Sequence, residues 1–132
     1  MSFIPSVPMA RAPAGSTTVV TNTAASALST SGGLTASTTQ TQGEGALTAE
    51  FNRIATVAND LDTVTLPEAV AGSRCFITNQ GACRLQIFPA SGDSIDDLAA
   101  DTPVYLDGGQ RAQFVAADET RWYAFVAFPV SY

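Results

Sequence analysis

Short runs of apolar and β-branched residues alternate with clusters of turn-forming residues from about residue 46 onwards. The predicted strands occupy residues 63–66, 74–78, 84–88, 104–106, 111–116 and 121–127. The residues between them include Pro67, Gly72, Gly81, Pro89, Gly92, Pro103, Gly108 and Gly109. Strands that recur every ~8–12 residues with Gly and Pro between them are typical of sandwiches and jelly rolls. The pattern predicts an all-β fold, in the form of a small antiparallel β-sandwich or jelly-roll-like domain.

The segment 46–58, which opens this region, fits two periodicities. Its apolar residues follow helical spacing, namely Leu47, Phe51, Ile54 and Val57 or Ala58. Its later part, residues 53–57, can also be extended. We favour a strand.

One hairpin can be worked out in detail. Two apolar segments, 74–79 and 82–88, flank a Gln80-Gly81 pair that suits a tight turn. The resulting register places Cys75 and Cys83 on opposite faces of the hairpin, so we expect no disulfide between them. The face that we assign to the core carries Phe76, Thr78, Cys83, Leu85 and Ile87.

The other face of this hairpin mixes apolar residues with arginine. It carries Cys75, Ile77, Arg84, Gln86 and Phe88. Interface cores favour aromatic residues and Arg and avoid Lys, which makes this face a candidate subunit contact. A second internal layer of the same domain is an equally open alternative.

The last predicted strand is apolar on both faces. Alternation places Trp122, Ala124 and Val126 on one face and Tyr123, Phe125 and Ala127 on the other. A domain of this size can barely cover one core, so one face is expected to meet another subunit, the alternative being a central core strand. The residues predicted to form an oligomer interface are Ile77, Arg84, Phe88, Tyr123 and Phe125.

The first third of the chain has a different composition. Residues 1–50 contain 17 Ser or Thr, three charged residues and one aromatic. Such a segment has too little apolar area to offset the cost of ordering it alone, so we predict an extended arm over 1–45 and a β domain over 46–132. Residues 17–21 could add a strand to a sheet edge of another subunit. The residues predicted to bind capsid or neighbouring subunits are Phe3, Ile4, Val7, Met9, Val19 and Val20.

Charge and residue usage narrow the function classes. The six basic residues are all Arg, there is no His, and twelve acids give a net charge of −6. This balance disfavours nucleic acid as a partner, because the phosphate backbone would be repelled. Without His or Lys the commonest general base, metal ligand and Schiff-base former are missing, so we expect neither an enzyme nor a cofactor. No apolar stretch approaches the ~20 residues of a membrane span, and no secretory signal is recognisable, which favours assembly in a cytoplasm.

Four acids gather within nine residues, at Asp93, Asp96, Asp97 and Asp101. Oxygen-rich loops can bind Ca²⁺, but this spacing does not fit an EF-hand loop. We favour turn formers whose carboxylates accept backbone N–H bonds.

A family resemblance covers about residues 46–126. It is carried by LPEAVAG at 66–72, NQGA at 79–82, FPASGDSI at 88–95, LAA at 98–100, GGQRA at 108–112, FV at 114–115 and WY at 122–123. In these elements the chain resembles small β proteins encoded with the capsid genes of tailed bacteriophages. The resemblance implies a capsid decoration (cement) or head-fibre protein, commonly a homotrimer at local threefold axes of the shell.

Together these observations predict a virion structural protein on the capsid surface, assembled in the host cytoplasm. It would decorate and stabilise the capsid as a homo-oligomer, with its arm on the major capsid protein. The alternative from another class is a fibre or tail-tip adhesin that binds host glycans through aromatics such as Trp122.

Overall fold

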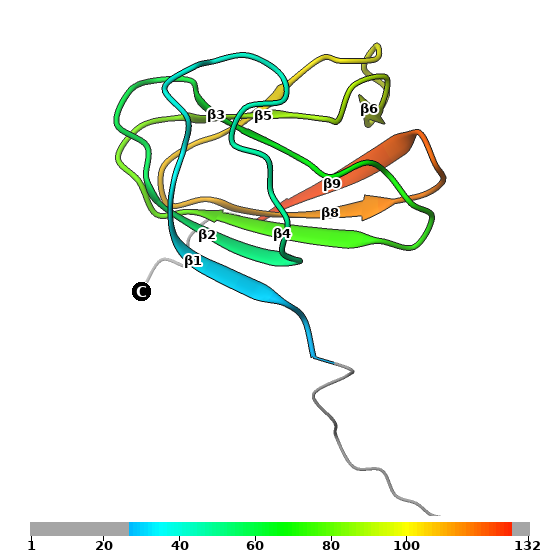
Figure 1. The fold of residues 1–132 in the computed structure, drawn as a ribbon, viewed down its shortest axis with the longest axis horizontal. Coiled ribbons are helices and arrows are strands. Elements are labelled where there is room, and N and C mark those ends of the chain that lie inside the picture. Colours follow the sequence, from blue (N-terminus) through cyan, green and yellow to red (C-terminus); the bar gives the residue numbers. More distant parts are fainter. Residues whose placement is uncertain (1–26, 128–132) are drawn as a thin grey trace, which may run out of the picture.

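The computed structural model describes residues 27–127, which form nine β-strands and contain no helix (Figure 1). The strands are β1 Thr30–Thr35, β2 Phe51–Thr56, β3 Asp62–Thr65, β4 Arg74–Asn79, β5 Leu85–Phe88, β6 Ser94–Ile95, β7 Val104–Leu106, β8 Arg111–Ala116 and β9 Arg121–Ala127. Within this part of the chain no helix qualifies by length and apolarity as a membrane span.

The strands form two sheets with the core between them. The larger sheet has the order β1-β2-β4-β8-β9-β6, and the smaller one has the order β3-β5-β7. Figure 1 shows the smaller sheet above the larger one. Both sheets contribute to one buried apolar cluster, with Ile54, Ile77 and Phe114 from the larger sheet and Val64 and Ile87 from the smaller one.

The middle of the chain winds in a solenoid-like manner. From β2 to β5, successive strands alternate between the sheets, and strands two apart pair in parallel, β2 with β4 and β3 with β5. Parallel pairing also joins β1 to β2 and β6 to β9, whereas β8 is antiparallel to β4 and β9. The all-β prediction is therefore confirmed. The predicted antiparallel arrangement is wrong for the parallel pairs.

Most of the predicted strands are present. The bounds of β7, β8 and β9 coincide with the predicted segments, those of β4 and β5 differ by one residue at one end, and β3 is shifted by one residue. The ambiguous segment 46–58 contains strand β2, as favoured. The two-residue strand β6 was not predicted, because it lies within the acid-rich turn.

The predicted hairpin between residues 74 and 88 is wrong. Strands β4 and β5 belong to different sheets, so the chain crosses the core between them instead of turning back. The faces of β4 are consequently reversed: Cys75 and Ile77 are buried, whereas Phe76 and Thr78, which were assigned to the core, are half-buried on the outer side.

A buried asparagine holds this crossing in place. The Asn79 side chain donates from Nδ2 to the carbonyls of Cys83 (3.0 Å) and Leu106 (2.9 Å), and its Oδ1 accepts the Gly81 N–H (2.9 Å). Gly81 is needed for close packing, because a Cβ there would lie 2.5 Å from the backbone nitrogen of Val57. The Gln80-Gly81 pair is therefore not a hairpin turn. Gly81 instead allows the crossing segment to pack closely against Val57.

The described part of the predicted arm belongs to the domain. Strand β1 lies at the edge of the larger sheet and pairs with β2, so the boundary predicted at residue 46 is wrong and the ordered domain includes β1. Ala36 and Leu47 are buried in the core, although the sequence around them is almost wholly polar. The arm residues 1–26 lie outside the described residues.

Side-chain amides explain how so polar a segment becomes ordered. Gln40 Nε2 donates to the carbonyl of Asp60 (2.8 Å) and to the buried carboxylate of Asp62 (3.0 Å). Gln42 Nε2 donates to the carbonyl of Pro89 (2.8 Å) and to the carboxylate of Asp101 (3.0 Å). Composition shows how little apolar area this segment can bury, but it does not show these long-range hydrogen bonds, which help to order the segment.

The two cysteines are free and occupy different environments. Cys75 is fully buried in β4, and Cys83 is half-buried in the crossing, where its thiol lies 3.5 Å from the Ala58 carbonyl. The predicted hairpin does not exist, so its two faces cannot be what separates them. They are separated by the crossing from one sheet to the other.

We expect native protein at pH 8 to react with iodoacetamide at Cys83 well before Cys75. Burial raises the pKa of the Cys75 thiol from its ordinary value of 9.0 to about 12, a smaller effect of the Glu50 charge acts in the same direction, and a hydrogen bond from Asn52 opposes it. Because the folded pKa is the higher one, the stability linked to Cys75 is complete below pH 9 and is lost as pH rises towards 12. Mass spectrometry of partially labelled protein measures the order, and equal labelling rates would contradict the buried position of Cys75.

Candidate functional site: an arginine and aromatic face

The outer side of the larger sheet carries a row of side chains across four strands, and this aromatic row has a phenylalanine on three of them. The strand registers place Phe51 beside Phe76, Phe76 beside Gln113, and Gln113 beside Phe125. The rings of Phe51 and Phe76 stack with centroids 6.0 Å apart. Phe125 is 59% exposed, which is unusual for a phenylalanine on a regular strand.

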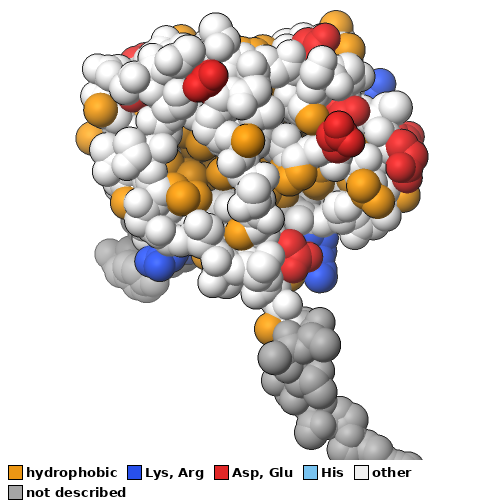
Figure 2. Space-filling view, viewed as in Figure 1, with side chains coloured by type: hydrophobic (Ala, Val, Ile, Leu, Met, Phe, Trp, Pro, Cys, Tyr) orange, Lys and Arg blue, Asp and Glu red, His pale blue; other side chains and the backbone are white. Residues whose placement is uncertain are grey.

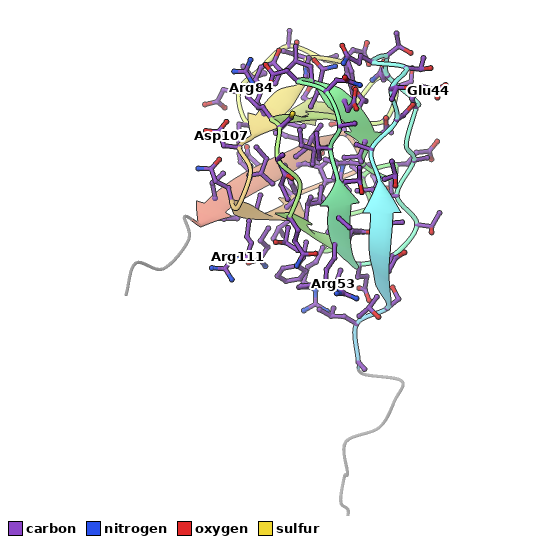
Figure 3. All side chains as sticks on the ribbon, turned by 90° about the vertical axis from the view of Figure 1, so that its left-hand side faces the viewer. Glu44, Arg53, Arg84, Asp107 and Arg111 are labelled. Carbon is purple, nitrogen blue, oxygen red and sulfur yellow. The ribbon has the colours of Figure 1, made fainter. Side chains whose placement is uncertain are left out.

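Arginines flank this aromatic row on both sides. Arg53 and Arg111 stand beside Thr78 in the next row, and Arg74 stands beside Val115 and Tyr123 in the row on the other side. Figure 3 shows Arg53 and Arg111 projecting on the same side of the molecule, from β2 and β8. We define the arginine–aromatic face as the outward residues Phe51, Arg53, Arg74, Phe76, Arg111, Gln113, Tyr123 and Phe125.

The same face contains a hollow and lacks acids. A hollow of about 300 Å³ is lined by residues of β2, β4, β8 and β9, among them Phe51, Phe76 and Phe125. None of the strands β1, β2, β4, β8 and β9 contains Asp or Glu. Arg111 also lines this hollow. An open apolar hollow on a face that carries arginines has the chemistry of a protein-binding surface, in which aromatic residues and Arg are enriched.

The predicted interface residues do not form one surface. Tyr123 and Phe125 lie on the arginine–aromatic face, where they are 40% and 59% exposed. Ile77, in contrast, is 1% exposed in the domain core, so its assignment to an oligomer interface is wrong, as a consequence of the wrong hairpin register. Arg84 and Phe88 belong to the smaller sheet's side of the domain, where Arg84 directly precedes β5 and Phe88 is its last residue.

Arg84 has partners of its own within the domain. Its guanidinium lies 3.5 Å from the Asp60 carboxylate and 5.2 Å from the centre of the Tyr105 ring. The predicted capsid-binding residues lie outside the described part of the chain, namely Phe3, Ile4, Val7, Met9, Val19 and Val20.

The face residues that sequence reasoning missed are Phe51, Arg53, Arg74, Phe76 and Arg111. Each of them alternates with a buried neighbour along its strand, which is the signal that could have found them. The signal was misread for Phe76, because the assumed pairing of β4 with β5 turned it inwards.

Trp122 is unavailable for the glycan contact that the adhesin alternative assigned to it. Its side chain is 1% exposed in the core, and its indole nitrogen has no hydrogen-bond partner among residues 27–127. A sugar could reach this ring only if the two sheets separated, so the stacking surface of that alternative is missing.

The acid-rich segment forms turns, as favoured from the sequence. Asp93 Oδ2 accepts the N–H of Ala69 (2.9 Å), and Asp96 Oδ1 accepts that of Ala124 (3.0 Å). Asp101 accepts a hydrogen bond from the Gln42 side chain and another from the Gly92 backbone, and both lower the pKa of its carboxyl. Among the described residues, no three His, Cys, Asp or Glu side chains are grouped as metal ligands.

Comparisons with known proteins add no assignment. Neither the scan against protein-family models nor the searches of curated proteins and of solved structures found a match to this chain.

Proposed function

We propose that the chain is a non-catalytic structural protein of a tailed-bacteriophage virion. In this proposal it sits on the capsid surface as a homo-oligomer, most simply a homotrimer, and its N-terminal segment binds the major capsid protein. It needs no cofactor and contacts neither nucleic acid nor membrane. The more specific fold class, a β-sandwich or jelly-roll-like domain, also stays a prediction.

The arginine–aromatic face carries this proposal. Tyr123 and Phe125 are exposed on this face, and Phe125 also lines its apolar hollow. Contact of these apolar groups with water is unfavourable in free energy. Protein contact removes that cost, and the flanking arginines can hydrogen-bond to carboxylates at the edge of such a contact. These properties favour a protein that works by binding other protein.

The N-terminal segment gives the second support. Residues 1–26 contain one charged side chain, Arg11, and several apolar residues. A sequence of this kind attaches best to a surface built by other chains, because it cannot bury its own apolar groups. Linked to an oligomer, several weakly binding copies would act together on a symmetric shell.

Virions that lack the chain are expected to release their DNA at a lower temperature than virions that carry it. A ligand that binds only the assembled shell stabilises it by about 2.7 kcal/mol per site at a concentration of 100 Kd. A dye-release melt of wild-type and gene-deleted particles measures the shift, and adding purified full-length chain should restore it. Absence of the chain from mass spectra of purified virions would end the proposal.

A further inference from the structure

The arginine–aromatic face is the basic region of an otherwise acidic protein. It holds three of the six arginines, and the whole chain has a net charge of −6, so everything outside this face sums to −6 − 3 = −9. Within residues 27–127, Arg53, Arg74 and Arg111 take part in no ion pair; the pair found there joins Arg84 to Asp60. The three guanidinium groups on the face are therefore free to pair with carboxylates of another molecule.

This charge distribution disfavours a twofold contact of the face with itself. In such a contact the same patch of two copies would meet, which places arginines opposite arginines, with no Asp or Glu in the strands of the larger sheet of either copy. Like charges at a desolvated contact cost free energy. A second copy can bind this face favourably only through a different, acidic part of its surface.

Such an acidic part lies at the end of the larger sheet where β8 turns into β9. We define the acidic end as the exposed residues Glu68, Val70, Asp97, Leu98, Asp118 and Glu119. Figure 2 shows acidic and hydrophobic side chains together on this side of the molecule, at the right of the view. Four carboxylates near exposed Val70 and Leu98 complement the arginines near exposed Tyr123 and Phe125.

Three loops form the acidic end, and hydrogen bonds connect them to one another. The Ala69 N–H bonds to Asp93 Oδ2 (2.9 Å), and the Ala71 N–H bonds to Glu119 Oε2 (3.3 Å). The Ser94 N–H bonds to the Thr120 carbonyl (2.8 Å). These contacts tie the loops at 67–72, 93–98 and 117–120 to one another, so a partner would meet them in a fixed arrangement.

We infer that the arginine–aromatic face of one copy binds the acidic end of the next copy, head to tail. This inference rests on the homo-oligomer proposed above. A contact between two different patches repeats around a rotation axis and closes into a ring when the rotation permits. Cyclic oligomers such as a trimer use contacts of this type, whereas a twofold dimer does not.

The test uses two charge-reversed forms of the full-length chain. The face variant is Arg53→Glu with Arg111→Glu, and the end variant is Glu68→Arg with Asp97→Arg. Each keeps one half of the contact intact. In sedimentation velocity at low salt, wild type is expected to be oligomeric and each variant alone monomeric, whereas a one-to-one mixture associates again, because the intact face of one variant meets the intact acidic end of the other. Raising the salt should weaken assembly of wild type.

A matched control separates specific pairing from net charge. Glu44→Arg with Asp107→Arg changes the total charge by the same amount as the end variant, at exposed positions outside both surfaces. Figure 3 shows Glu44 and Asp107 well away from Arg53. This control should assemble as wild type does, and thermal melts by circular dichroism should show all forms folded.

Three results would overturn the inference: a wild-type chain that stays monomeric, an end variant that assembles normally, or a mixture that fails to associate. The assay contains no capsid, so its outcome is independent of the proposed capsid role. A chain that assembles as inferred but is absent from virions would leave the contact standing and remove the capsid role. A monomer that still decorates shells would do the reverse.

Discussion

Removing residues 2–45 is expected to abolish cooperative folding, whereas removing residues 2–26 is expected to leave the melting temperature of the domain almost unchanged. The longer deletion removes β1, an edge strand of the larger sheet, together with the buried side chain of Ala36. It also removes Gln40, a hydrogen-bond partner of the fully buried Asp62 carboxylate. A buried polar group that loses a hydrogen-bond partner destabilises the folded state.

Circular dichroism and thermal melting of the two truncated chains measure this difference. A chain without residues 2–45 that melts as sharply as wild type would show that β1 and the following loop are accessories to the fold. The shorter deletion also serves the functional proposal. It should keep the oligomer contact and lose attachment to the shell, because it removes the segment that contains Phe3, Ile4, Val7 and Met9.

Replacing Asn79 with alanine is expected to destabilise the domain by about 3–5 kcal/mol, since each buried hydrogen-bonding group left unpaired costs about 1–3 kcal/mol. The change removes the donors to the carbonyls of Cys83 and Leu106 and the acceptor of the Gly81 N–H. These three groups lie at the point where the chain passes from the larger sheet to the smaller one. For a domain of this size, the loss corresponds to a fall in melting temperature of roughly 10–20 °C.

The matched control for this substitution is Gln80→Ala. Gln80 is the next residue along the chain and is exposed, so its truncation should change the free energy of unfolding by less than about 0.5 kcal/mol. Urea unfolding of both variants compares them directly. Equal stability of Asn79→Ala and Gln80→Ala would contradict the part that we assign to the Asn79 side chain in joining the two sheets.

The strands could be predicted from the sequence where local pattern decides them. Turn residues bound β8 and β9, whose side chains alternate between the two faces of each strand, and the two strands pair with each other across a short turn. The same alternation placed Tyr123 and Phe125 on the face opposite Trp122, and this side of the prediction is confirmed, with Trp122 buried and the other two exposed.

The pairing of the strands could not be predicted in the same way. Strand β4 pairs in parallel with β2 and antiparallel with β8, and these segments are separated from it by many residues. No local signal distinguishes that arrangement from a hairpin around Gln80-Gly81. The decisive features are the buried Asn79 and the close approach of Gly81 to Val57, and both depend on the assembled fold.

The arginines of the candidate site were missed for a related reason. In the sequence Arg53, Arg74 and Arg111 are isolated charges, and only the sheet order brings their strands together. Once Phe76 was assigned to the core, the aromatic row across β2, β4, β8 and β9 could not be recognised. The interface was therefore predicted from the supposed hairpin and from β9, whereas the structure shows a face built from β2, β4, β8 and β9.

Electron cryo-microscopy of intact virions, at a resolution that distinguishes strands, tests the capsid role most directly. We expect density for residues 27–127 on the outside of the shell, in a ring of copies whose arginine–aromatic faces are covered by the acidic ends of their neighbours. Shells that carry no such density, with the chain located on tail fibres, would contradict it.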